Sequence, residues 1–446
     1  MPLYAGICQS DITPPLGVWM CGYALRPTGC VGVHDPLKAC ALVLNDGKTA
    51  LALVAMDLLG LDFDLVDRVR QGITEQTGIP SGAIMLSATH THGGPNVREF
   101  TCMGSRDPLY VEMLVRKLVG IVVQAFHKMR PASLAYGRAP VQIGVNRRQT
   151  SPGGPTVLGC NWSGPVAPNV DALLVRDSRG GPMALLFSHA CHPTTLGGEN
   201  LLITGDYCGF ACDRVEYELD GDTTAFFLQG CAGNINPHPR GTFEDAKKHG
   251  RELAMAALEA LSAAEPLASS RLGFAEETVE LPLIPPPSAA ECEETISRLS
   301  AQLDEDRLGG QIGRIMHTDG LLNFTRYQLS FAQDRNAKLS KPFTIQAFNI
   351  YGARVLGLPA EMFVQYALDF ERQASVPVFS VAYSNGVHGY VPTAADYPYG
   401  GYEVDMAYKY YGTLMYTPGC ELIIRKAAYK LMGIEKPDYT PYAVDV

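Results

Sequence analysis

The stretch "TALALVAMDLLG", from Thr49 to Gly60, is a continuous apolar run of the kind that forms a buried β-strand. It is followed by "DFDLVDRVRQGITEQTG" (62–78), in which apolar residues recur at helical spacing. Residues Ala83 to Ser87 then predict a second strand. A strand, a helix and a strand in this order are typical of a layered α/β fold. The unit therefore predicts an α/β protein in which mixed β-sheets are layered with helices.

Elements of both types continue along the chain. The predicted elements are a helix near Pro108–Lys128, strands at Leu134–Gly137, Ala172–Val175 and Met183–Ser188, and a helix at about Phe243–Ala263. "LPLIPPPSAAE" (281–291) breaks this pattern, polar helical sequence follows to about Leu339, and strand-like runs then return. We interpret residues of about 285–340 as a helical insertion packed on a single α/β domain that covers residues 1–446.

Composition and charge exclude several classes of protein. The chain has 446 residues, of which 46% are hydrophobic, and a formal net charge of −10 without blocks of like charge. Neither a nucleic-acid partner nor a polybasic membrane patch is therefore expected. No apolar run is long enough for a membrane anchor, and the N-terminus lacks the pattern of a signal peptide. We expect a cytoplasmic protein whose 12 cysteines are mostly reduced, and a homo-oligomer stays open.

Two strand-to-turn junctions hold four of the 10 histidines. "MLSATHTHGGPN" (85–96) places His90 and His92 where a strand ends, and alternate residues of a strand face the same side. "LLFSHACHPTTLGG" (185–198) ends in His189 and His192. Imidazole is the commonest metal ligand, although histidines in a polar turn can instead cap backbone groups. We interpret His189 as a buried histidine bonded to backbone and His192 as the better candidate ligand.

Two later segments could complete a site. In "ARVLGLPAEMFVQYALDF" (353–370), Glu361 is expected to open an amphipathic helix, where an acidic residue can simply favour the helix dipole. Together with two histidines, however, it gives the His₂Glu set of catalytic zinc sites. The loop "YSNGVHGYVPTAADYPYGGYEVD" (383–405) is rich in tyrosine and glycine, and we expect Tyr390 and Tyr402 to line a pocket. Phosphate-binding loops, dinucleotide fingerprints and serine nucleophile elbows are absent from the sequence.

Nine short stretches, in order along the chain, resemble the neutral/alkaline (non-lysosomal) ceramidases, a family of zinc amidases. They are "SDITPPLGVWMCGYA", "GVHDPLKACALVL", "SATHTHGGP", "VNRR", "HPTT", "GDYCGFACDRVE", "FLQGCAGNINP", "LPAE" and "GYVPT". The resemblance implies the family's catalytic domain and one zinc ion per chain. The ligands it implies are His90, His192, Glu361 and Tyr390. It also implies that His92 and Arg147 line the substrate site and that Tyr402 is a further pocket tyrosine.

The chain departs from the family pattern at one functional stretch. Ceramidases carry a serine that serves the active site, whereas this chain has Asn234 and Asn236 in the stretch Gly233–Pro237. The chain also ends soon after the tyrosine-rich region, so no C-terminal immunoglobulin-like domain is expected. Because buried amides select polar partners, we expect Asn234 and Asn236 to bind a polar part of a small substrate.

The sequence therefore predicts a zinc-dependent hydrolase that uses metal-activated water to cleave an N-acyl or cyclic amide bond in a small polar molecule. In this hypothesis His92 moves protons or holds the carbonyl oxygen, and Arg147 binds an anionic or oxyanionic group. Tyr390 and Tyr402 complete the catalytic set. The alternatives are a zinc esterase or lactonase, a true ceramidase, and a non-catalytic metal-binding homologue.

Overall fold

A computed structural model describes residues 2–150, 154–267, 269 and 271–440 of the chain. The apolar run that starts at Thr49 forms β4 (Ala50–Met56), which α1 (Phe63–Thr77) connects to its parallel neighbour β5 (Ile84–Ala88). This unit lies at one edge of a nine-stranded sheet. The strand order is β12-β10-β9-β6-β1-β3-β4-β5, and the short β14 pairs with β6. The pairs β4–β5 and β10–β12 are parallel and the other pairs are antiparallel, so the sheet is mixed.

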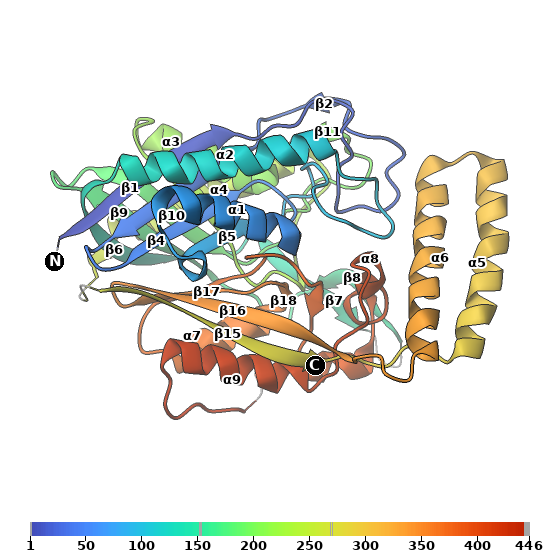
Figure 1. Cartoon of the computed structure of the whole chain (residues 1–446). Coiled ribbons are helices and arrows are strands. Elements are labelled where there is room, and N and C mark those ends of the chain that lie inside the picture. Colours follow the sequence, from blue (N-terminus) through green and yellow to red (C-terminus); the bar gives the residue numbers. More distant parts are fainter. Residues whose placement is uncertain (1, 151–153, 268, 270, 441–446) are drawn as a thin grey trace.

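The remaining strands of this sheet are β1 (Leu3–Asp11), β3 (Lys38–Asn45), β6 (Arg130–Pro140), β9 (Asn169–Asp177), β10 (Pro182–His189), β12 (Thr224–Gln229) and β14 (Glu265–Pro266). Four helices cover one face of the sheet (Figure 1). Besides α1 they are α2 (Pro108–His127), α3 (Asp206–Glu218) and α4 (Phe243–Ser262).

Two glycines explain how closely these helices approach the sheet. A Cβ atom on Gly6 of β1 would lie 1.9 Å from the carbonyl oxygen of Ala125 in α2. A Cβ atom on Gly137 of β6 would lie 1.8 Å from that of Ala260 in α4. In the β1–β6 register the two glycines lie on the same face, because side chains alternate along each strand. Helices α2 and α4 therefore pack side by side on this face, where no larger residue would fit.

A second, four-stranded sheet packs against the other face (Figure 1). Its order is β15 (Leu272–Pro282), β16 (Ser340–Ile350), β17 (Ala353–Gly357) and β19 (Val378–Val381). Helices α7 (Val364–Gln373) and α9 (Cys420–Met432) cover its outer face. Apolar side chains of both sheets, such as Leu134, Leu173, Phe343 and Phe379, share one core cluster. The layers are thus helix, sheet, sheet and helix, and the predicted α/β fold with mixed sheets is confirmed.

The helical insertion expected at about 285–340 is a pair of antiparallel helices, α5 (Ala289–Gly309) and α6 (Ile312–Gln333), which extends from the side of the sheets (Figure 1). Helix α6 touches the body at two glycines. A Cβ atom on Gly313 would meet the carbonyl oxygen of Leu25 at 2.3 Å, and one on Gly320 would meet that of Thr101 at 1.9 Å. The insertion is therefore seated against the loops that precede α2.

The remaining elements of the fold are short. They are β2 (Gly32–Val33) with β11 (Leu202–Ile203), β13 (Ile235–Pro237) with β7 (Gly144–Thr150) and β8 (Thr156–Asn161), β18 (Glu361–Met362) with β20 (Tyr390–Val391), the 3₁₀ turns η1 (Ser81–Ala83) and η2 (Ala394–Tyr399), the π-helical turn η3 (Tyr402–Met406), and α8 (Ala407–Tyr410).

All twelve cysteines are free thiols. Among the described residues, no helix combines the length and the apolar character needed to span a membrane.

Candidate metal centre and active site

The carboxyl ends of β5, β10 and β12 converge, although β5 and β12 are opposite edges of the nine-stranded sheet. Gln229, the last residue of β12, donates its side-chain amide to the carbonyl oxygens of Thr89 and Cys191 at 3.2 and 2.7 Å. These two residues directly precede His90 and His192. One buried glutamine therefore holds together the two turns that carry the candidate ligands.

The expectation that His90 and His92 share one side of a strand is wrong in its backbone detail. Strand β5 ends at Ala88, and His90 has a φ of 67°, in the left-handed region that non-glycine residues rarely adopt. The two rings nevertheless lie 5.1 Å apart, centroid to centroid. A tight turn rather than a strand thus brings them together, and strained backbone of this kind is frequent at functional sites.

The rings of His90 and His192 are both fixed through Nδ1. His90 donates from Nδ1 to the carbonyl oxygen of Leu59 at 2.7 Å, and His192 donates to that of Ala232 at 2.6 Å. Each ring therefore presents the lone pair of Nε2 to the same point, which is how metal-binding histidines are usually held. His90, His92 and His192 place ligand atoms within 4.8 Å of one another. By contrast, His189 bonds the carbonyl oxygen of Asn169 and stays apart from this group.

Glu361 reaches the same point from the other half of the chain. It does not open a helix as predicted, since it lies in β18, parallel to Tyr390 of β20, and α7 begins only at Val364. Its Oε2 lies 3.0 Å from Nε2 of His192 and 3.3 Å from Nε2 of His90. Its other oxygen, Oε1, accepts a hydrogen bond from the phenol of Tyr411. The carboxylate is thus held so that one oxygen faces the two histidines.

This arrangement fits a divalent metal. Burial, with the charge of Arg147, lowers the pKa of His192 to about 4, so its ring is neutral at neutral pH. Three lone-pair donors then face one another in a buried place, and His90 Nε2 has no hydrogen-bond partner among the residues that the structure describes. A cation would relieve this repulsion, and two imidazoles with one carboxylate suit zinc.

Tyr390 adds a fourth potential ligand atom, a second oxygen, to this centre. Its hydroxyl lies 3.4 Å from Nε2 of His192 and accepts a hydrogen bond from Arg147 at 2.9 Å. Burial raises the pKa of Tyr390 well above its ordinary value, so the phenol is neutral at neutral pH. The structure thus brings together all four residues that the sequence singled out as ligands, His90, His192, Glu361 and Tyr390.

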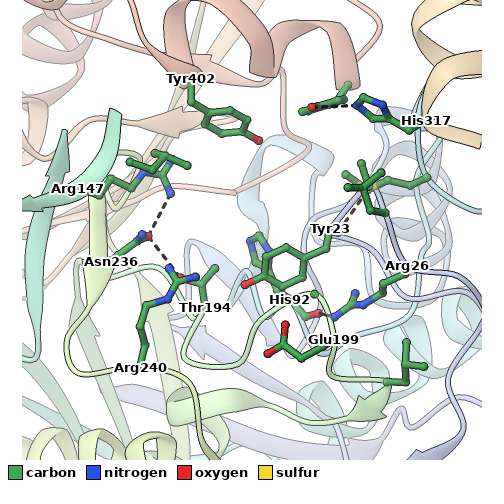
Figure 2. A pocket seen from close by; sticks show the side chains of 18 of the residues that line it. Tyr23, Arg26, His92, Arg147, Thr194, Glu199, Asn236, Arg240, His317 and Tyr402 are labelled. Atoms are coloured by element: carbon green, nitrogen blue, oxygen red, sulfur yellow. Dashed lines mark hydrogen bonds between the residues drawn. The ribbon is translucent and has the colours of Figure 1, made fainter. Parts of the chain in front are cut away.

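A cavity of about 780 Å³ opens in front of this centre (Figure 2). It is lined by Gly22, Tyr23, Ala24, Leu25, Arg26, Pro27, His92, Met103, Arg147, Leu158, Thr194, Gly198, Glu199, Leu201, Asn236, Arg240, His317, Tyr390, Tyr402 and Tyr410. His90, His192 and Glu361 are outside this set and almost fully buried. The cavity therefore meets the candidate ligands through Tyr390 and His92.

His92 differs from the two histidines behind it. Neither of its ring nitrogens has a hydrogen-bond partner among the described residues, although both are buried. Burial, together with the neighbouring histidines, lowers its pKa well below the usual value, so the ring is neutral. No second contact fixes which nitrogen carries the proton, unlike in His90 and His192. His92 is thus free to accept or donate a proton on the cavity side.

Arg147 connects the cavity to a buried carboxylate that the sequence did not single out. Its Nε donates to Glu403 at 2.8 Å, and its two terminal nitrogens donate to Asn236 and Tyr390 at 3.2 and 2.9 Å. Burial opposes the charge, but Tyr390 and Glu403 raise the pKa of Arg147 well above its ordinary value. Arg148 binds the other oxygen of Glu403 at 2.7 Å. The guanidinium is therefore rigid and permanently charged.

The two asparagines have different surroundings. Asn236 lines the cavity, and its Oδ1 accepts hydrogen bonds from Arg147 and, at 3.4 Å, from Thr194. Asn234 does not line it: its amide donates to Gln365 and its oxygen accepts from the backbone of Val364. The expectation that Asn234 binds substrate is therefore wrong, because its side chain joins the turn between β12 and β13 to the start of α7.

Tyr402 lines the cavity as expected, with its hydroxyl directed inward (Figure 2). Sequence reasoning missed Tyr411, Glu403, Arg240 and His317. Glu403 lies within the tyrosine-rich loop and Tyr411 shortly after it, so the composition of this region was the available signal for both. Nothing in the sequence marked His317, which reaches the cavity only because α6 is seated beside it.

Comparison with known proteins points to one family. The sequence model described as "neutral/alkaline non-lysosomal ceramidase, N-terminal" matches residues 4–261. The neutral ceramidase of Pseudomonas aeruginosa is 24% identical over 281 residues, which are 57% of this chain and 41% of that protein. Neutral ceramidase A of Dictyostelium discoideum is 26% identical over 259 residues, 53% of this chain and 36% of that protein. The match thus spans well under half the length of these relatives.

Solved structures agree on the fold. The crystal structure of neutral ceramidase from Pseudomonas aeruginosa superimposes with a TM-score of 0.71 and 21% identity, covering 100% of this chain and 77% of that one. A ceramidase complexed with C2 gives a TM-score of 0.72 and 20% identity, covering 99% and 77%. The segment matched by the family model contains His90, His92, Arg147, His192 and Asn236, whereas Glu361 and Tyr390 lie beyond it.

Proposed function

Because the chain belongs to the neutral/alkaline non-lysosomal ceramidase family, we propose that it is a zinc-dependent amidase that hydrolyses the bond between an acyl group and an amine. One observation carries this proposal. The Nε2 atoms of His90 and His192 and the Oε2 atom of Glu361 meet in a buried place, where His90 Nε2 has no hydrogen-bond partner among the described residues. This place lies behind a cavity that His92 and Tyr390 line.

His90, His192 and Glu361 would hold the metal, with Tyr390 beside it or bound to it. When bound, zinc supplies Lewis-acid polarisation of the amide carbonyl and lowers the pKa of water. We assign the third protein ligand to Glu361 rather than His92 for two reasons. Glu361 contacts both other ligands, and Tyr411 fixes its second oxygen as an outer partner usually does.

The remaining groups act on the substrate. His92 is neutral and unpartnered, so it can take up a proton on one ring nitrogen and deliver it to the nitrogen of the leaving amine. Arg147 donates to the oxygen of Tyr390, which leaves the phenol hydrogen free to point at the carbonyl oxygen. Charge that develops on this oxygen would then be stabilised by a fixed donor next to a permanent cation.

Ceramide is the reference substrate, since the matched relatives are named neutral ceramidases. The size of the cavity supports this choice, and so do the apolar side chains of Leu25, Pro27, Met103, Leu158 and Leu201 in its lining, which could contact an acyl chain. The expectation of a small polar amide had relied on two asparagines, of which only Asn236 lines the cavity. A small polar amide remains a second candidate substrate because Asn236 and Arg240 offer free hydrogen-bond donors in the cavity.

The test combines metal analysis with a substrate panel. Protein purified without added metal should contain about one zinc per chain. It should also cleave detergent-dispersed ceramide or an N-lauroyl amine with a kcat/KM above roughly 10⁴ M⁻¹s⁻¹, within the ordinary range of enzymes. Chelation should abolish turnover and zinc should restore it. Full activity of metal-free protein would refute the proposal. Cleavage of esters or lactones but of no amide would favour the esterase alternative. The absence of any turnover would favour a non-catalytic homologue.

A further inference from the structure

On the wall of the cavity next to Arg147, two side chains, Asn236 and Arg240, carry N–H groups without an acceptor among the described residues. Figure 2 shows Arg147, Asn236, Thr194 and Arg240 together on this wall. Because Oδ1 of Asn236 already accepts from Arg147 and Thr194, the orientation of its amide is fixed and Nδ2 is its free end. No acceptor for Nδ2 occurs among the described residues. Asn236 therefore presents only N–H groups to the cavity.

Arg240 adds a cation without a counter-ion. Unlike Arg147, which pairs with Glu403 at 2.8 Å, Arg240 has no ion-pair partner in the part of the chain that the structure describes. Its backbone position is nevertheless fixed on both sides. Gly241 donates to the carbonyl oxygen of Thr195 at 2.8 Å, and His249 binds that of Pro239 at 2.6 Å. The free guanidinium thus extends from an anchored turn into the lining.

The other charged residues that line the cavity do not neutralise the charge of Arg240. Arg26 is buried, and its two terminal nitrogens bind only the carbonyl oxygens of Cys21 and His92, while its Nε has no partner. Within the described ranges, Glu199 is the single acid that lines the cavity, and its charge acts on Arg26. The negative charge of Glu199 compensates the positive charge of Arg26, and Glu403 compensates Arg147. The positive charge of Arg240 therefore remains uncompensated. The cavity is therefore cationic in a chain whose net charge is −10.

We propose that Arg240 and Asn236 form a subsite for a carboxylate on the amine side of the cleaved amide, so that the preferred substrate is an N-acyl amino acid rather than a neutral N-acyl amino alcohol. The inference rests on the proposed amidase function and specifies its substrate class. An ionised carboxylate only accepts hydrogen bonds and so matches the unused N–H groups of Asn236 and Arg240, and hydrogen bonds between ionised partners are the stronger ones. An isolated local cation in an acidic protein would also attract an anionic substrate.

A matched pair of substrates tests the subsite. N-lauroylglycine and N-lauroylethanolamine share the acyl chain and the amide and differ only in a terminal carboxylate or hydroxymethyl group. We expect wild-type protein to favour N-lauroylglycine by roughly tenfold or more in kcat/KM, as hydrogen bonds to charged groups are worth more than neutral ones. Arg240→Gln should lower this ratio about tenfold, mainly through KM, and Arg240→Lys should keep part of it. Arg179→Gln, an exposed arginine in the turn after β9, should leave the ratio unchanged.

A binding measurement separates this inference from the proposed function. Calorimetric titration of wild-type and Arg240→Gln protein with N-lauroylglycine at 4 °C, under conditions where turnover is negligible or absent, should show weaker binding by the variant. If neither amide is cleaved but this difference in binding is found, the amidase proposal fails and the subsite stands. If both amides are cleaved equally well, or if Arg240→Gln leaves the ratio and the binding unchanged, the subsite is refuted and the amidase proposal stands.

Discussion

The phenol of Tyr411 donates a hydrogen bond to Oε1 of Glu361, which leaves Oε2 alone to face His90 and His192. Arg98 lies over the ring of Tyr411 at 5.2 Å and Phe100 packs edge-on against it, so the phenol is held in place from behind. The carboxylate can therefore offer the proposed metal only one oxygen, in one orientation.

Tyr411→Phe should weaken zinc binding by roughly 10- to 100-fold, the usual cost of removing an outer partner of a metal ligand. A competition titration with a coloured chelator measures this directly. The matched control is Tyr410→Phe, because the hydroxyl of Tyr410 faces His317 and does not contact Glu361. Equal zinc affinity of Tyr411→Phe and wild type would show that Tyr411 has no positioning role.

Substitution of the histidines should separate metal binding from proton transfer. His192→Ala should lose the metal, since this ring contacts Glu361 and is fixed at Ala232. His92→Ala should keep the metal and lose activity by roughly 10²- to 10³-fold, as is typical for a general acid–base or oxyanion contact. Elemental analysis and single-turnover assays give both quantities. His92→Ala without metal would mean that the three-histidine group, and not the set with Glu361, is the ligand set.

Arg147 and Glu403 should be strongly coupled in stability. Arg147→Met leaves a buried carboxylate with one cation fewer, and breaking buried pairs in this way typically costs about 3–5 kcal/mol. The cost should be at the lower end, because Arg148 still binds Glu403. Adding Glu403→Gln should recover part of it. Urea denaturation of the two single variants and the double variant measures the coupling, and purely additive losses would contradict it.

The stability of the protein should depend on the titration of Asp57, at the end of β4. Burial, reinforced by the nearby charge of Asp35, raises the pKa of Asp57 to about 7. Between its unfolded pKa, near 4, and pH 7 the folded state binds one more proton than the unfolded state. This contribution to stability is complete at about pH 4 and is lost as the pH rises through 7.

Asp57→Asn removes this dependence and keeps an oxygen that can accept from the Lys38 backbone, as Asp57 does at 2.8 Å. Relative to wild type, the variant should gain stability from pH 5 to pH 8, by at most roughly 4 kcal/mol. The control is Asp64→Asn, in the exposed first turn of α1. Denaturation curves at several pH values give the difference, and parallel pH profiles of Asp57→Asn and wild type would refute this assignment.

Features that depend on residues within one segment could be predicted from the sequence, whereas features that depend on pairing between segments could not. The parallel unit β4–α1–β5, the helices α2 and α4 and the insertion were predictable because hydrophobic spacing and turn residues lie within each segment. The strands β1 and β3 escaped notice. The alternation of β1 is interrupted by glycine, cysteine and polar residues, and β3 is a run of small and apolar residues whose type is settled by its pairing with β1 and β4. Glu361 was expected in a helix because "EMFVQYALDF" has helical spacing, yet pairing with Tyr390 keeps its first residues extended.

The same distinction between local and tertiary features applies to the site. His90, His192, Glu361 and Tyr390 could be chosen from residue type and resemblance, but the left-handed turn at His90 and the contact between Tyr411 and Glu361 are tertiary features. The donor-only orientation of Asn236 likewise depends on Arg147 and Thr194, which are distant in sequence. No pattern within a single segment could have revealed these relations.

The candidate ligands follow strands of both sheets, since His192 comes after β10 and Glu361, in β18, comes after β17. His192 and Glu361 are separated by 169 positions in the chain. A zinc ion bound between them would be a cross-link that joins the two sheets and closes long loops, and such cross-links disfavour the unfolded ensemble more as the loop grows. The order of synthesis adds a constraint. Glu361 and Tyr390 leave the ribosome long after the histidines, so the complete ligand set exists only when the second sheet has been made. Zinc retention would thus report that the whole assembly, and not only its first half, has formed.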